Sequence, residues 1–325
     1  MKETDFQNII ICPDCREKLK WGIKSASCKK CSKKYLIKNS VICFLNNNDK
    51  FYENVYTRQI HYIPGKNLLK NWGFFNLVQS GILGEIKKNI NPKSIVLDTG
   101  CAGGIKWLGE YANTVGLDIS FGSLLRAKQF YDFTVQAEVK KLPFQKLSFD
   151  LIYGSYIFEH LSGDEKELFL KETQRVLKPK GKLILQFDTL SKNWLYRFAS
   201  RDSQSFQRGF INIDQHIGLE YASKAISRIE NNGFKIVKIK KFGTTFLQYE
   251  PTYNWLNEAY GKSIFLVKLL GKITKKIANN KYLGPIMEFC ITLFDKLINP
   301  FSKLDKATRI IVIAEKNKYG FKNKR

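Results

Sequence analysis

The stretch SIVLDTGCAGG, from Ser94 to Gly104, decides how the chain folds. It opens as a short apolar run and then places an acid, Asp98, ahead of a cluster of glycines. An apolar run that breaks into glycines is typical of a strand whose following turn brings backbone close to another group. The pattern predicts a buried strand followed by either a tight strand-to-helix turn or a nucleotide cradle.

The residues after this turn favour the cradle. A helical pattern covers 105–111, and NTVGLDIS over 113–120 predicts a second strand that ends at Asp118. Asp118 lies 20 residues after Asp98, and an acid at the tip of the second strand suits a ribose diol. Together these features predict a nucleotide-binding half-fold.

The glycine turn does not fit a dinucleotide. The dinucleotide fingerprint is G-x-G-x-x-G, and counted from Gly100 this chain has Ala102 and Ile105 at the other two glycine positions. Asp98 would also repel a pyrophosphate. It suits a cofactor that joins adenosine to a cationic amino group without phosphate, such as S-adenosylmethionine.

At these residues the chain resembles the class I S-adenosylmethionine-dependent methyltransferases, whose first motif is D/E-x-G-x-G-x-G. Further motifs follow in the family's order: LPF at 142–144, FD at 149–150, EHL at 159–161 and RVLKPKG at 175–181. The resemblance covers about residues 90–190 and returns in pieces to residue 316. It implies an α/β fold, a Rossmann-like seven-stranded methyltransferase sheet with helices on both faces.

The resemblance also implies where the cofactor binds. The turn should let backbone approach the methionine and ribose, Asp98 should lie near the amino group, and Asp118 should hold the ribose hydroxyls. Three positions depart from the family's motifs: Ala102 replaces a glycine, Glu138 stands where Asp is commoner, and Lys180 replaces a glycine of the turn before the fifth strand, which bears on structure only. The implied cofactor residues are Asp98, Gly100, Ala102, Gly104, Asp118, Ile119, Glu138, Val139, Tyr153, Gly154 and Ser155.

Glu159 and His160 are the candidate catalytic residues, because they follow the fourth strand where the acceptor pocket should open. His160 could take a proton from a hydroxyl acceptor, or the pair could help to bind a divalent metal. The alternative is that both only pack and form hydrogen bonds at the start of a helix. His216 lies in a segment that is either a lid or an ordinary surface loop.

Two C-x-x-C pairs near the N-terminus predict a metal site. Cys12 and Cys15 form one pair, Cys28 and Cys31 the other, with twelve residues between the pairs. Four thiolates complete a tetrahedral zinc site with no open position, so the zinc should be structural. Disulfides or unpaired thiols are the alternatives, and they fit an intracellular chain poorly. With the strand–turn–strand pattern at 33–45, the segment resembles the zinc-ribbon modules that precede many methyltransferase domains.

These patterns predict the domain boundaries. Residues 1–48 form the zinc-ribbon module, 49–92 a connector and helical cap, and 93–320 the methyltransferase domain. Two inserts interrupt that domain, a lid at 191–219 that mixes aromatic and basic residues, and a helical insert at 251–304.

The chain is strongly basic, with a net charge of +25 from 54 basic and 29 acidic residues. Such a charge suits nucleic acid or an anionic membrane, or reflects a biased composition. Only 10 of the basic residues are Arg, and Arg is the better residue for reading phosphates and bases, so a nucleic-acid partner is disfavoured.

The helical insert carries apolar residues at helical spacing, such as Leu266, Leu269 and Ile273, with lysines between them. Lysines beside apolar helix faces predict binding to an anionic membrane surface through 261–300, or else packing on the sheet or in a dimer. The sequence has no signal-peptide pattern and no spanning apolar run, which predicts a cytoplasmic protein, peripherally bound to membrane if the insert binds lipid.

The sequence therefore predicts an enzyme that transfers a methyl group from S-adenosylmethionine to a lipid, lipid-linked or other hydrophobic small molecule. Two alternatives stay open. One is a methyltransferase of ribosomal or transfer RNA, and the other is a non-catalytic interaction protein that docks through its zinc ribbon.

Overall fold

The structure is a computed structural model of the 325-residue chain. It describes residues 3–45, 82–201, 203–212, 215–244 and 297–317, and scattered positions between 265 and 294. Most of the predicted connector, including His61, and most of the helical insert lie outside the described residues.

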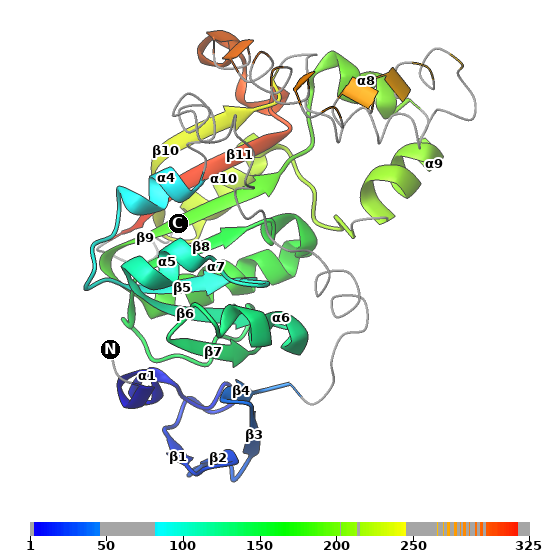
Figure 1. Cartoon of the computed structure of the whole chain (residues 1–325). Helices are drawn as coiled ribbons and strands as arrows, with labels where there is room; N and C mark the ends of the chain where they lie inside the picture. The colour runs from blue at the N-terminus through cyan, green and yellow to red at the C-terminus, as the bar shows by residue number, and fades with distance from the viewer. Residues whose placement is uncertain are drawn as a thin grey trace.

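A seven-stranded sheet forms the centre of the molecule, as predicted (Figure 1). Its order is β7-β6-β5-β8-β9-β11-β10. The first five strands are parallel, whereas β11 runs antiparallel to both β9 and β10. The strands are β5 Ile95–Thr99, β6 Asn113–Asp118, β7 Phe133–Gln136, β8 Phe149–Ser155, β9 Leu177–Asp188, β10 Phe234–Phe242 and β11 Arg309–Lys316.

Helices cover both faces of this sheet, because its strands carry apolar side chains on both faces. In β5, Val96 belongs to one apolar core and its neighbour Leu97 to the other, as side chains that alternate across a strand require. One core takes in α4 Ile82–Lys87, α5 Lys106–Tyr111 and α6 Phe121–Ala127, and the other takes in α7 Gly163–Val176 and α10 Ala222–Asn231.

The N-terminal segment folds as a small β module. It consists of α1 Glu3–Ile9, β1 Leu19–Trp21, β2 Ser25–Cys28, β3 Lys34–Lys38 and β4 Val41–Cys43. Asn39 and Ser40 join the last two strands with positive φ angles of 49° and 61°, the conformation that a two-residue hairpin turn needs. The predicted strand, turn and strand are confirmed here.

This module continues the central sheet. β4 pairs in parallel with β7, with Ile42 opposite Val135, so that eleven strands form one sheet. Across the same junction Phe6 stacks on Phe133 with ring centroids 6.1 Å apart. Arg16 donates to both carboxylate oxygens of Glu172 on α7, at 2.9 and 2.8 Å. The sequence does not predict this pairing, because β4 carries no mark of its partner.

The segment after β9, predicted as a lid, is helical, and we call it the helical cap; it is distinct from the cap predicted at 49–92. It is made of α8 Trp194–Ala199, α9 Ser203–Phe206 and a π-helical turn at Gln207–Asn212 (Figure 1). Short 3-10 turns occur at Phe158–His160, Asn299–Phe301 and Leu304–Lys306. Within the described part of the chain, no helix has the length and apolar character needed to cross a membrane.

Candidate functional site

The glycine turn follows β5 at the edge where the parallel strands end. Gly100 and Gly104 have φ angles of 67° and 75°, which favour glycine. A Cβ on Gly104 would lie 2.9 Å from the Cα of Ala127, so α6 also closes the space. Ala102, which replaces the usual glycine, has a φ of 43°. The turn therefore keeps the backbone shape of a glycine loop at this position.

Asp118 holds this turn from the tip of β6. Its Oδ2 accepts the N–H of Ala102 and its Oδ1 accepts the N–H of Ser120, both at 2.8 Å. Carboxylate oxygens are hydrogen-bond acceptors, the kind of group that ribose hydroxyls need as partners. The two hydrogen bonds therefore join the glycine turn to Asp118, the acid predicted to hold the ribose.

Asp98 is buried beneath the turn. The hydroxyls of Tyr131 and Tyr153 donate to its Oδ2 at 2.5 and 2.7 Å. Burial raises the pKa of Asp98 to about 7, although both tyrosine hydrogen bonds oppose that rise. A carboxyl poised at this value ionises readily beside a cation, which suits the cationic amino group predicted for the cofactor.

Tyr153, implied at the methionine, directs its hydroxyl to Asp98 and is buried at the end of β8. Gly154 is closely packed, since a Cβ there would lie 2.8 Å from the Oγ1 of Thr99. Ser155 completes the strand. Tyr131 was not predicted, because it is brought to Asp98 only by the fold.

The implied adenine residues lie next to one another beyond β6 and β7. Gln136, at the end of β7, donates from its side chain to the carbonyl of Ile119 at 2.9 Å. Val139 is buried, and Glu138 is partly exposed in an ion pair with Lys140 at 3.6 Å. Gln136 thus braces the Ile119 backbone, a role that the sequence did not indicate.

The structure brings Glu159, His160 and His216 together. Their potential ligand atoms lie within 4.8 Å of one another, and the two imidazole rings are 5.0 Å apart. His160 Nδ1 lies 3.2 Å from the carbonyl of Gln215. Because a carbonyl only accepts, Nδ1 carries the proton and Nε2 keeps its lone pair.

Burial controls the charges in this group. Burial, followed by the nearby Asp188, raises the pKa of Glu159 well above its usual value. Burial lowers the pKa of His160, and burial together with His160 lowers the pKa of His216 to about 4. Burial therefore favours the uncharged form of all three side chains. Two neutral imidazoles and a carboxyl could serve a proton transfer or bind a divalent metal.

The four N-terminal cysteines form a second cluster, in the β module. Cys12 and Cys31 have their Sγ atoms 3.6 Å apart, Cys15 and Cys28 have theirs 3.2 Å apart, and all four lie within 4.8 Å of one another. The backbone N–H groups of Lys30 and Cys31 point to the Sγ of Cys28 at 3.4 and 3.5 Å. Converging thiols with backbone donors fit a structural zinc ion.

Comparison with known proteins assigns the central region. Residues 97–185, from β5 to β9, match the family described as the methyltransferase domain. The chain contains a class I S-adenosylmethionine-dependent methyltransferase domain. The match includes the glycine turn, Asp118 and the Glu159–His160 pair, and it leaves out the cysteine module and the helical cap.

Two curated relatives share this methyltransferase domain. An Encephalitozoon cuniculi protein, named only as a methyltransferase, is 39% identical over 95 residues, which are 29% of this chain and 44% of the relative. The phosphoethanolamine N-methyltransferase of Plasmodium falciparum is 28% identical over 165 residues, which are 48% and 60% of the two chains. The chain thus spans about half the length of these relatives.

Among solved structures, the phosphoethanolamine N-methyltransferase 2 of Haemonchus contortus in complex with S-adenosyl-L-methionine aligns with a TM-score of 0.47 at 18% identity. The alignment covers 74% of this chain and 53% of that one.

Proposed function

We propose that this protein transfers a methyl group from S-adenosylmethionine to an amphiphilic acceptor, a lipid, a lipid-linked compound or another hydrophobic small molecule. The observation that carries the proposal is the Asp118 carboxylate, which ties the glycine turn to the tip of β6 through Ala102. A glycine turn flanked by two acids, Asp98 and Asp118, suits adenosine joined to a cationic amino acid.

The cofactor would supply a methyl group already activated by a sulfonium, so the chain's own residues mainly bind and orient. The turn offers backbone to the methionine and ribose, Asp98 offers a carboxyl to the amino group, and Asp118 offers acceptors to the ribose hydroxyls. Ile119 and Val139 would line the adenine.

His160 is the side chain best placed to take a proton from the acceptor. Its lowered pKa keeps the ring neutral, and the Gln215 carbonyl fixes the lone pair on Nε2. Glu159 is buried with a raised pKa, and its Oε1 accepts the N–H of Asp188 at 3.2 Å. It thereby ties the turn after β8 to the end of β9. A divalent metal held by Glu159, His160 and His216 is the alternative role for the same group.

The helical insert supports an amphiphilic acceptor. Its described residues include helical apolar side chains that are exposed, among them Phe265, Leu269, Ile273 and Ile286. From residue 261 to the end, 15 basic residues outnumber 4 acidic ones. Apolar helix faces beside lysines would bind an anionic membrane surface, where a lipid acceptor is found.

An RNA acceptor is the second candidate, and the net charge of +25 favours it. It predicts binding that weakens steeply with salt. The scarcity of Arg disfavours it, and so do the exposed apolar side chains of the insert. A non-catalytic interaction protein would not need the constellation around Asp118.

The test is a labelling experiment with methyl-labelled S-adenosylmethionine and an extract of cells that make the protein. The labelled mixture is separated into an organic phase, an RNA fraction and a soluble fraction, and D118N serves as a control for contaminating enzymes. We expect label in the organic phase with the wild-type protein and at least tenfold less with D118N. Label in RNA would overturn the amphiphilic acceptor, and label independent of Asp118 would overturn the site.

A further inference from the structure

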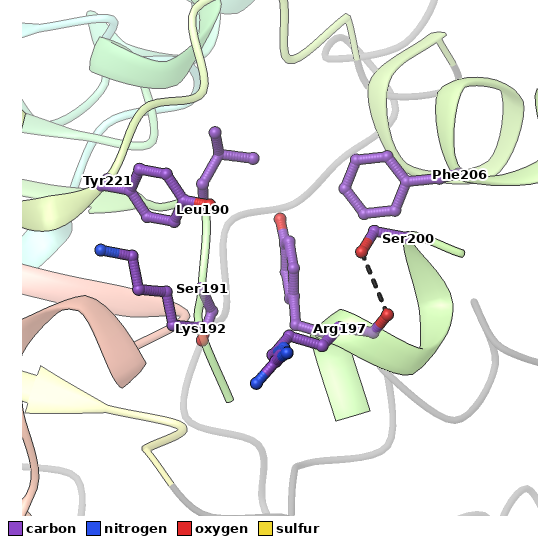
Figure 2. A pocket seen from close by; sticks show the side chains of 8 residues that line it. Leu190, Ser191, Lys192, Arg197, Ser200, Phe206 and Tyr221 are labelled. Carbon is purple, nitrogen blue, oxygen red and sulfur yellow. Dashed lines mark hydrogen bonds between the residues drawn. The ribbon is translucent and has the colours of Figure 1, made fainter. Parts of the chain in front are cut away.

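A cavity of about 330 Å³ lies in the helical cap, away from the glycine turn. Figure 2 shows it between the chain that leaves β9 on one side and helices α8 and α9 on the other. The side chains that form it include Leu190, Lys192, Tyr196, Arg197, Phe206 and Tyr221.

The cavity adjoins the acceptor side of the methyltransferase domain. Leu190 follows the carboxyl end of β9, where ligands bind in open α/β sheets, and its N–H donates to the carbonyl of Glu220 at 3.0 Å. Two residues before Glu220, the N–H of Gly218 donates to the carbonyl of Glu159 at 2.8 Å. One short segment thus connects the cavity wall at Tyr221 to the Glu159–His160 pair.

Buried polar groups hold the shape of the cavity. The side chain of Asn193 accepts the N–H of Tyr196 at 2.8 Å and so caps α8, while its own amide donates to the carbonyl of Gly243 at 3.1 Å. Ser191 donates to the carbonyl of Lys306 at 2.7 Å. Asn193 and Ser191 are 3% and 5% exposed, so Tyr196 and Arg197 project from a fixed base.

The walls of the cavity are aromatic and its charges are positive. Tyr196 is buried and meets Phe206 edge-on, with ring centroids 5.4 Å apart. Lys192 lies over the ring of Tyr221 at 4.7 Å and is paired with Asp305 at 2.9 Å. Arg197 is exposed, and no acidic partner faces it among the residues that the structure describes. None of the side chains that line the cavity is acidic.

We propose that this cavity binds the phosphate group of the acceptor, with Arg197 as its main ligand and the aromatic walls against the first carbons of an apolar chain. An Arg fork matches phosphate oxygens in two parallel hydrogen bonds. Lys192, partly neutralised by Asp305, adds a second positive charge. The inference rests on the proposed function and narrows the acceptor from an amphiphile to a phosphate-bearing amphiphile.

The test is a calorimetric titration of the full chain with octyl phosphate, 1-octanol and inorganic phosphate. Octyl phosphate is kept below its micellar concentration and 1-octanol below its solubility limit. We expect octyl phosphate to bind at least tenfold more tightly than either of the others. R197Q should weaken octyl phosphate binding at least tenfold, and R197K should give an intermediate loss. R201Q removes an equal charge outside the cavity on the same cap and should stay within twofold of the wild-type protein.

Several results would overturn the proposal. If 1-octanol binds as tightly as octyl phosphate, the cavity binds apolar chains and not phosphate. If inorganic phosphate binds as tightly as octyl phosphate, the cavity binds a small soluble phosphate. Equal losses in R197Q and R201Q would mean attraction by net charge alone. Tighter, Arg197-dependent binding of a single-stranded oligonucleotide would assign the cap to RNA. The titration needs no cofactor, so its failure is separate from a failure to bind or use S-adenosylmethionine.

Discussion

For Asp98, the sequence predicts the position beside the cofactor and the structure supplies the hydrogen-bond partners. Its place before the glycines predicts an acid beside the cofactor, but only the fold shows that two tyrosine hydroxyls bind it in a buried site. Hydrogen bonds from Tyr131 and Tyr153 stabilise the ionised form, and burial outweighs them. The carboxyl is therefore half-ionised near neutral pH.

This state makes cofactor affinity depend on pH. With a pKa of about 7 in the free protein, Asp98 is mostly protonated at pH 6 and mostly ionised at pH 8. A cationic amino group binds the ionised form, so S-adenosylmethionine should bind about tenfold more tightly at pH 8 than at pH 6. In D98N the affinity should be weaker and nearly constant over this range. Titrations at three pH values measure the cofactor affinity of the wild-type protein and of D98N. A wild-type affinity that does not change with pH would mean that Asp98 does not bind the amino group.

His160 should affect chemistry more than cofactor binding. We expect H160A to lower the rate of methyl transfer about 100-fold or more, the usual effect of removing a general base, with cofactor affinity within twofold of the wild-type value. Metal analysis of both proteins decides the role. If the wild-type protein and H160A each hold one zinc per chain, His160 acts as a general base. If the wild-type protein holds a second divalent ion that H160A lacks, Glu159, His160 and His216 bind a metal.

At the scale of elements, close backbone contacts position the acceptor side. Gly218 joins the segment 215–220, which follows the helical cap, to the turn after β8, because its N–H donates to the carbonyl of Glu159. A Cβ on Gly218 would lie 1.8 Å from the carbonyl oxygen of Leu161, so only glycine fits there. The sequence marks this glycine no differently from others in loops.

G218A should therefore destabilise the fold as well as the site. Relief of the clash requires the backbone to move, and we expect a loss of about 1 to 3 kcal/mol in the free energy of unfolding. G163A is the matched control, since a Cβ there meets only the Nη2 of Arg228, at 3.8 Å. Urea unfolding of both variants measures the difference. Equal stabilities would show that the 215–220 segment does not pack as described.

The elements themselves were largely predictable. The apolar run at 95–97, the strand pattern of NTVGLDIS at 113–120 and the glycines between them place β5 and β6. The cap of α7 is visible as Ser162 and Glu165, which form a capping box. Contacts that join distant segments were not predictable, since Tyr131, Gln136 and His216 reach their partners only through the fold. No local pattern indicates which side chains those will be.

At the scale of the whole molecule, the β module and the methyltransferase domain share one sheet. The N–H of Phe44 donates to the carbonyl of Gln136 at 2.9 Å, and the side chain of Gln136 holds Ile119. The module therefore braces the strand that ends beside the predicted adenine site. The cysteine spacing predicts the metal cluster, but the pairing of β4 with β7 has no signal in the sequence.

Loss of the cysteine cluster should consequently lower the stability of the whole sheet. We expect one zinc per chain in the wild-type protein and in C290S, whose cysteine lies outside the cluster, and less than half of that in C28S. Because β4 pairs with β7, C28S should unfold at a lower temperature in a single transition. Elemental analysis and calorimetry measure these. Full zinc content in C28S would contradict the predicted zinc site, and an unchanged unfolding temperature would contradict the bracing.

The most direct measurement is a calorimetric titration of the purified chain with S-adenosylmethionine, alongside D118N and the exposed control E110Q. Asp118 ties the glycine turn to β6 and is proposed to bind the ribose hydroxyls, so D118N should bind the cofactor at least tenfold more weakly. We predict one cofactor per chain, with E110Q within twofold of the wild-type affinity. No binding to the wild-type protein, or equal binding to D118N, would contradict the cofactor site built around SIVLDTGCAGG.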